Sequence, residues 1–161
     1  MRTIALTFAV FSLAAPTSAA EIYKLDKAAK ARKELPVTWF FRNLKDNCES
    51  GEPPEIDLNI PPKGGTVCLR PGMVPVRNIW TGRNQHCIGT STWGVRAIYI
   101  PFESFIGVDS MQFTVKMGRP WRTYEANISV EAGEVTAGDA SSAPSEPQKV
   151  GPMPKCPALV S

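Results

Sequence analysis

The amino-acid sequence predicts an all-β protein, an antiparallel β-sandwich of about seven strands. Three observations favour this class. Short runs rich in β-branched and aromatic residues recur between Val37 and Val130, and several of them alternate apolar and polar positions. The fifteen prolines and twelve glycines of the whole chain favour short strands and turns over long helices. No segment of that range shows the periodicity of a helix.

Residues 1–20 have the three-part layout of a secretory signal peptide. Arg2 gives a positive start, Ile4–Ala15 is almost wholly apolar, and small residues lead to a cleavage point after Ala20 or Ala19. The apolar run is shorter than the roughly 20 residues that span a bilayer, and no later segment is long and apolar enough to do so. We therefore expect a cleaved signal peptide, no membrane span, and a periplasmic or secreted protein.

Residues 21–36 are polar, basic and rich in helix formers. Ile22, Leu25 and Ala29 would line one side of a short helix, which Pro36 would end. We expect a flexible, solvated N-terminal arm before the sandwich. The alternative is an arm that contacts an anionic envelope surface through its excess of basic residues.

The predicted sandwich domain covers residues 37–130. Its six or seven strands are expected at Val37–Asn43, Glu55–Ile60, Gly65–Leu69, Val74–Trp80, Val95–Ile100, Met111–Met117 and Ala126–Val130. Alternation with a period of two is clearest in the second run and in the last two. It directs one set of side chains into a core and the other toward water.

Residues 131–161 form a tail in which 17 of 31 residues are Ala, Ser, Gly or Pro and none is aromatic. Such a composition cannot bury enough apolar surface to offset the entropy of ordering it, so we expect a flexible tail. Cys156 is the exception, because a cysteine at this place is best explained as a tether back to the domain.

Four cysteines, Cys48, Cys68, Cys87 and Cys156, lie in the exported part. An even number in a small exported protein indicates two disulfides, for which three pairings exist. A metal centre is the alternative, but zinc ligands come in close pairs, whereas no two of these cysteines form C-x-x-C and the only histidine is His86. We expect two disulfides and no metal.

The sequence is poor in the residue types that catalysis uses. Ser-His-Asp and Cys-His arrangements would depend on His86 alone, and its neighbour Cys87 is expected to be oxidised. Gly64-Gly65 is not followed by the lysine of a phosphate-binding loop. A net charge of +3 is too small for the basic field of a nucleic-acid binder. We therefore expect no enzymatic activity, no cofactor and no nucleic-acid partner.

One stretch of the chain carries a recognisable pattern. The residues from Tyr99 to Val115, YIPFESFIGVDSMQFTV, resemble the Y-x-P…F-x-G-x-D-S-F signature of bacterial Ig-like and cadherin-like envelope domains. Ile60–Val67, IPPKGGTV, is similar to the P-P-x-x-G-x-V strand and turn that opens these modules. Met111 stands where an aromatic residue is usual, and Arg70–Gly94 is an unusually long insert. The resemblance covers Cys48–Val130 and implies an Ig-like sandwich.

The resemblance also implies a disulfide pairing. Small proteins of this type often carry one cysteine before the first motif and one in the insert. Cys48 and Cys87 match those places, which leaves Cys68 to pair with Cys156.

Within the motif, Gly107 and Asp109 are expected to form a structural turn. Gly107 allows a tight bend, and Asp109 can accept hydrogen bonds from nearby backbone amides. Acidic residues bind calcium in some cadherin-like relatives. However, Glu103 is the only other acid within ten residues of Asp109, and calcium requires six or more oxygen ligands. We expect a structural role.

The insert contains the residues best suited to binding, namely Trp80, Arg83, His86 and Trp93. On a loop of a rigid scaffold they form a possible binding surface; the alternative is that the tryptophans cover the open end of the sandwich. We expect an exported, non-catalytic Ig-like module with a structural or protein-binding role in the bacterial envelope, whose partner is an envelope or extracellular protein. The alternative function is a glycan-binding module that stacks a cell-wall sugar on a loop tryptophan.

Overall fold

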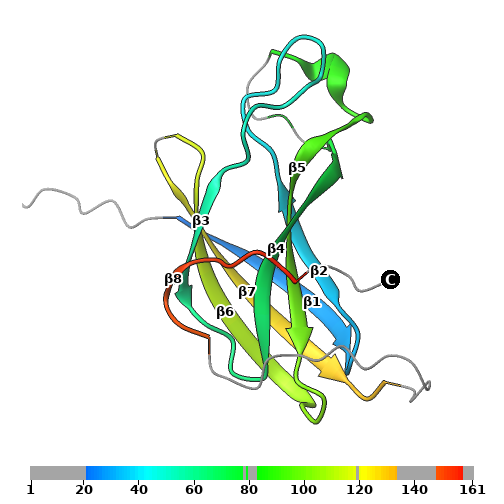
Figure 1. Cartoon of the computed structure of the whole chain (residues 1–161), viewed down its shortest axis with the longest axis vertical. Coiled ribbons are helices and arrows are strands. Elements are labelled where there is room, and N and C mark those ends of the chain that lie inside the picture. The colour runs from blue at the N-terminus through cyan, green and yellow to red at the C-terminus, as the bar shows by residue number, and fades with distance from the viewer. Residues whose placement is uncertain (1–20, 78, 80–82, 119, 134–147, 158–161) are drawn as a thin grey trace, which may run out of the picture.

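The computed structural model describes residues 21–77, 79, 83–118, 120–133 and 148–157. Within them the chain is all-β, as the sequence predicts: eight strands lie in two sheets, and a short 3-10 turn spans Gln85–Cys87 (Figure 1). The strands are β1 (Ile22–Lys30), β2 (Leu35–Phe40), β3 (Glu55–Ile60), β4 (Gly65–Pro75), β5 (Ser91–Pro101), β6 (Gly107–Lys116), β7 (Arg122–Glu131) and β8 (Gly151–Pro152).

The two sheets differ in size. The larger has the strand order β1-β7-β6-β3-β8 and the smaller the order β2-β5-β4. All neighbouring strands are antiparallel except β1 and β7, which are parallel. The prediction of a β-sandwich is therefore confirmed at the level of two sheets that share one core.

The core lies between the sheets and follows the predicted alternation. Tyr99 and Val67 enter it from the smaller sheet, and Leu58, Phe113 and Ile128 enter it from the larger one. Each of the five side chains is at most 1% exposed. Complete burial of a large apolar side chain contributes roughly 1.5–3 kcal/mol, so these layers supply much of the folding free energy.

The expectation of a flexible, solvated N-terminal arm with a short helix over residues 21–36 is wrong. Residues 22–30 form strand β1, which pairs in parallel with β7, and its burial alternates with a period of two. Leu25 lies opposite Ala126, and Ala29 is only 4% exposed opposite Val130. The exposed edge of β7 offers a full ladder of hydrogen bonds, and this tertiary pairing overrides the helix propensity of the segment. The sandwich thus begins near Ile22, not Val37.

The insert is also more regular than predicted. The expected strand Gly65–Leu69 and the first two residues of the expected strand Val74–Trp80 belong to one strand, β4, which pairs with β5 without interruption from Gly65 opposite Pro101 to Pro75 opposite Ser91. Beyond Pro75 the prediction is wrong for the residues that the structure describes, because 76, 77 and 79 are not in a strand. The strand continues through Pro71 because β4 is an edge strand, where proline is tolerated when the missing N–H would face outward. Much of the insert is therefore an extended β-hairpin.

Residues 148–157 return to the domain, as the position of Cys156 suggested. The N–H of Met153 donates to the carbonyl of Ile56 beside β3, and the N–H of Leu69 in β4 donates to the carbonyl of Pro154. The segment therefore crosses from an edge of the larger sheet to an edge of the smaller one. Two parts of the predicted tail, 134–147 and 158–161, lie outside the described residues. The predicted signal peptide, 1–20, also lies outside them.

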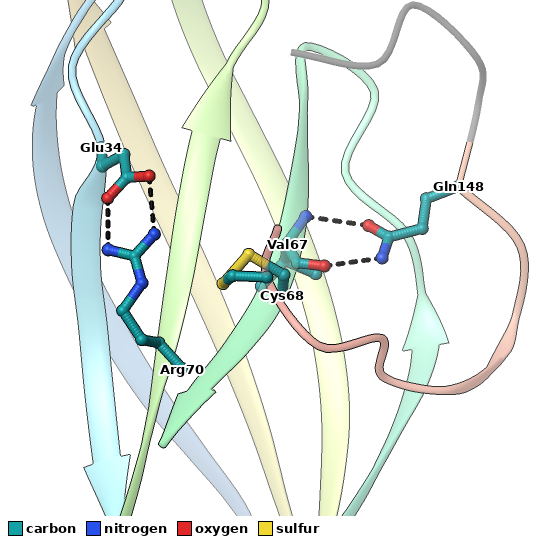
Figure 2. The surroundings of a disulfide bond; sticks show 6 residues. Glu34, Val67, Cys68, Arg70 and Gln148 are labelled. Atoms are coloured by element: carbon teal, nitrogen blue, oxygen red, sulfur yellow. Dashed lines mark hydrogen bonds and ion pairs between the residues drawn. A yellow bond between two sulfur atoms is a disulfide. The ribbon is translucent and has the colours of Figure 1, made fainter. Parts of the chain in front are cut away.

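Figure 2 shows how this C-terminal segment is held against β4. Cys68 and Cys156 form a disulfide with a Cα–Cα distance of 4.8 Å. The side-chain amide of Gln148 accepts from the N–H of Val67 at 2.9 Å and donates to its carbonyl at 2.6 Å, as a neighbouring strand would do. We name residues 148–157 the C-terminal clasp. It satisfies backbone groups that an open edge strand would expose to other chains.

Candidate binding site at one end of the sandwich

The predicted turn residue Asp109 marks one end of the sandwich, which we name the Asp109 end. This carboxylate is 5% exposed. Its Oδ1 accepts hydrogen bonds from the backbone N–H groups of Lys63 and Ser110, each at 2.9 Å. Its Oδ2 accepts from the N–H of Gly64 at 2.8 Å and from the hydroxyl of Tyr99 at 2.9 Å. Two bonds to each oxygen use the acceptor capacity of a carboxylate, so Asp109 offers no open ligand position.

Of the three amides that donate to Asp109, the N–H of Ser110 is a nearby one, as predicted, and the other two are not. These two belong to the turn before β4, 46 and 45 residues earlier in the chain, rather than to the turn at Gly107. Gly107 opens β6 with a φ of 130°, a conformation that suits glycine. Burial raises the pKa of the Tyr99 hydroxyl, and its hydrogen bond to Asp109 raises it further. The phenol therefore stays protonated and continues to donate.

The opposite end, which we name the cleft end, is made of three segments. They are the loop 41–54, the hairpin extension 70–94 and the β6–β7 turn. The disulfide Cys48–Cys87 joins the first two with a Cα–Cα distance of 5.4 Å. Both disulfides thus confirm the pairing that the resemblance implied. In Figure 1 the loop and the hairpin extension rise side by side beyond the rest of the sandwich.

Side-chain hydrogen bonds reinforce this disulfide. Asn84 donates from Nδ2 to the carbonyl of Leu44 at 2.6 Å, and the exposed His86 donates from Nε2 to the carbonyl of Asp46 at 2.8 Å. His86 lies close to both sulfurs, with all three potential ligand atoms within 4.8 Å of one another. The sulfurs are bonded to each other, however, so neither is a thiolate that could bind a metal.

A cleft of about 690 Å³ opens between the three segments. Its aromatic lining includes Trp39 and Phe41 from β2 and the following loop, and Tyr124 from β7. Among the lining residues that the structure describes are four arginines, Arg42, Arg77, Arg83 and Arg122, and no aspartate or glutamate. Such a lining produces a positive potential that attracts anions.

The arginines of the cleft differ in their partners. The guanidinium of Arg77 lies over the ring of Trp39, 5.1 Å from its centroid. Arg122 lies over the ring of Tyr23 at 6.0 Å. Burial raises the pKa of Tyr124, and the nearby Arg122 partly offsets that rise.

Arg42, Arg77 and Arg83 share a second property. Their side chains make no hydrogen bond or ion pair to the described part of the chain. Arg70, outside the cleft, is different, because it pairs with Glu34 through two hydrogen bonds of 2.6 and 2.8 Å. The three cleft arginines therefore have donors available for a ligand.

The structure places the predicted binding residues in different positions. Arg83 lies in the cleft, and His86 donates a hydrogen bond to the loop 41–54. Trp93 lies outside the cleft lining, opposite Met73 on the hairpin extension, and the two side chains are 52% and 51% exposed. Trp80 lies outside the described residues. The four predicted residues therefore do not form one surface in the described part of the chain.

Sequence reasoning missed most of the cleft. Arg42 and Arg77 are 35 positions apart and share no motif, and Trp39 and Phe41 were assigned to a strand with no ligand role. The only sequence signal was the local excess of basic over acidic residues that runs through Arg42.

Comparison with protein-family models, curated proteins and solved structures gives no match for this chain. Among the described residues, no helix has the length and apolar character that crossing a membrane requires. The two disulfides fit an oxidising compartment.

Proposed function

We propose that this chain is an exported, non-catalytic Ig-like module that binds a protein partner in the bacterial envelope through its cleft end. The sheet orders support the Ig-like relationship. Strands β2, β5 and β4 share one sheet, and β3, β6 and β7 share the other, as strands B, E, D and C, F, G do in immunoglobulin constant domains. The two disulfides support a periplasmic or secreted location.

The observation that carries the proposal is a set of three arginines in a cleft that has an aromatic wall: the side chains of Arg42, Arg77 and Arg83 make no hydrogen bond or ion pair to the described chain. Aromatic and arginine side chains dominate the energetic centres of protein interfaces. The state of the only histidine supports a binding role over catalysis. His86 donates to a backbone carbonyl, and its neighbour Cys87 is oxidised.

Site-specific photo-crosslinking tests the proposal. A photoreactive residue is placed at Met73 or at Pro120, which are exposed at the cleft end, and in control chains at Ile106 or Val108, which are 62% and 77% exposed at the Asp109 end. We expect the same protein adduct from both cleft-end positions and from neither control when the chain is expressed in its native envelope. Adducts that form equally at Val108 would show that the cleft end is not the contact surface.

Glycan binding is a second candidate, because half of the Trp93 side chain is accessible for stacking on a sugar. This candidate requires that the chain is retained on purified insoluble cell wall and that Trp93→Ala abolishes the retention. Crosslinking to a protein without such retention favours the first candidate.

A further inference from the structure

We infer that the cleft binds an extended acidic peptide segment, whose carboxylates are held by Arg42, Arg77 and Arg83. The inference rests on the proposed function, because it names the chemistry of the partner segment that enters the cleft. Three properties of the cleft support the inference: its charge, the contacts that hold its arginines in place, and its size together with its apolar lining.

The charge of the cleft is not neutralised by the described chain. The described lining residues include four arginines and no carboxylate, and three of those arginines make no hydrogen bond or ion pair to a described residue. Walls of one sign around a partly water-excluding cleft concentrate the field and raise the local concentration of opposite charge. A ligand that brings several carboxylates would relieve the repulsion among the guanidinium groups, so the favoured ligand is a polyanion.

The contacts that position Arg77 leave it suited to binding a carboxylate. Its guanidinium lies over the ring of Trp39, and the indole N–H of Trp39 donates in turn to the carbonyl of Pro75 at 2.9 Å. This cation–π contact uses none of the N–H donors of Arg77 in a hydrogen bond, so they are available for the forked, two-bond contact that arginine makes with a carboxylate. A lysine has the same charge but cannot form this contact.

The loops that carry the other two arginines are fixed to each other before any ligand binds. Arg42 is in the loop that contains Cys48, and Arg83 adjoins the turn that contains Cys87, so the disulfide and the bond from Asn84 to the Leu44 carbonyl join their supports. Pre-organised donors lose less conformational freedom when a ligand binds, which increases affinity.

Size and lining favour a peptide over other anions. A cleft of about 690 Å³ is far larger than one carboxylate or phosphate group needs. Its lining also contains the half-buried apolar side chains of Phe41, Ile79 and Met117. An extended peptide presents acidic and apolar side chains alternately and can use both features. A sugar would need an open aromatic face, and one face of Trp39 is already covered by Arg77.

Fluorescence anisotropy with the purified, oxidised chain tests the inference. The probe is a fluorescein-labelled octapeptide of alternating glutamate and valine, and the control peptide has glutamine in place of glutamate. We expect saturable binding of the acidic peptide only, weakened by added salt. The double variant Arg77→Gln/Arg83→Gln should weaken binding at least about tenfold, because two charged contacts are lost. Both side chains are exposed, so the variant is expected to fold.

Matched variants separate a site from general charge attraction. Lys30→Gln/Lys33→Gln removes the same charge from exposed positions near the Asp109 end and should change the dissociation constant by less than about twofold. Arg77→Lys keeps the charge but should still weaken binding several-fold, because the forked contact is lost. Equal weakening by the two double variants would overturn the inference.

Other anions provide the remaining outcomes. Competition by inorganic pyrophosphate, by polygalacturonate or by vesicles rich in phosphatidylglycerol that equals competition by the unlabelled acidic peptide would overturn the choice of a peptide. If crosslinking still marks the cleft end but the acidic peptide does not bind, this inference fails and the proposed function stands. If the peptide binds the arginines but no envelope protein is crosslinked at the cleft end, the proposed function fails instead.

Discussion

The two ends of the sandwich differ in whether their polar side chains have hydrogen-bond or ion-pair partners within the described chain. At the Asp109 end, a buried carboxylate has four hydrogen-bond donors, and the C-terminal clasp covers the edge of β4. At the cleft end, the side chains of three arginines make no hydrogen bond or ion pair to a described residue. The hydroxyl of Thr92, a residue that is 2% exposed, also has no hydrogen-bond partner in the described part of the chain.

This difference separates folding from binding. Groups that are satisfied internally stabilise a protein but have nothing left to offer a ligand, whereas groups left open contribute little to stability and can bind. The Asp109 end is therefore expected to control the free energy of unfolding, and the cleft end to control affinity for a partner. The following predictions test this division, beginning with the largest expected effect.

Removing the carboxylate of Asp109 should have the largest effect on stability. Asp109→Ala leaves three backbone N–H groups and the Tyr99 hydroxyl without their acceptor in the interior. We expect the free energy of unfolding to fall by about 3–5 kcal/mol, as for the loss of one partner in a buried charged network. Urea denaturation followed by intrinsic fluorescence measures the change.

Asp57 provides the control for this variant. Its carboxylate pairs with Lys116 at 2.6 Å on the surface of the same sheet, where solvent screens the interaction. Asp57→Ala should therefore cost far less stability than Asp109→Ala. Similar losses for the two variants would show that the buried network is not what holds the Asp109 end together.

The two disulfides allow the sharpest comparison between the ends. They join residues 39 and 88 positions apart, for which chain entropy alone gives ~3.9 and ~4.6 kcal/mol. We expect Cys48→Ala/Cys87→Ala and Cys68→Ala/Cys156→Ala each to lower the free energy of unfolding by about 2–4 kcal/mol. Stability alone would therefore hardly distinguish them.

Their other consequences should differ. Without Cys68–Cys156 the C-terminal clasp is no longer anchored, and the backbone groups of Val67 and Leu69 at the edge of β4 become available to a second chain. We expect this variant to self-associate in size-exclusion chromatography with light scattering. The variant without Cys48–Cys87 should keep the oligomeric state of the native chain but lose affinity for the acidic peptide. The reverse assignment of these two effects would refute the division between the ends.

The parts of the fold that the sequence predicted depend on local pattern. The runs 111–117 and 126–130 were recognised as strands because one face of each is buried and the other faces solvent. This produces an alternation of apolar and polar residues in the sequence. β1 was missed because its conformation depends on the edge of β7, about 100 residues away. A single sequence window contains no information about such a partner.

The candidate site was less predictable for a similar reason. Arg83 was recognised because it sits among aromatic and amide residues in the insert. Arg42 joins it only because the Cys48–Cys87 disulfide fixes the loop after β2 beside the hairpin extension. The absence of acidic residues from the cleft lining is a property of the folded surface, and three arginines scattered along the sequence do not reveal it.

The smallest expected effect comes from the ion pair between Glu34 and Arg70, which lies outside the cleft (Figure 2). Its two hydrogen bonds to Arg70 lower the pKa of the Glu34 carboxyl below its ordinary value of 4.5. A carboxyl whose pKa is lowered by folding adds stability above its unfolded pKa and loses it as the pH falls through the lower folded pKa. Because both side chains are about one quarter exposed, the pair should contribute no more than about 1 kcal/mol.

Urea denaturation of the native chain and of Glu34→Gln at several pH values measures this contribution. We expect the native chain to be more stable by a constant amount above about pH 5.5. The difference should shrink as the pH falls through 4.5 and below, and should be smaller in high salt. Affinity for the acidic peptide should be the same in both proteins at neutral pH, because neither Glu34 nor Arg70 lines the cleft. A Glu34→Gln chain that binds the peptide more weakly would show that stability and affinity are not separate in this chain, because a contact outside the cleft lining would then control the geometry of the cleft arginines.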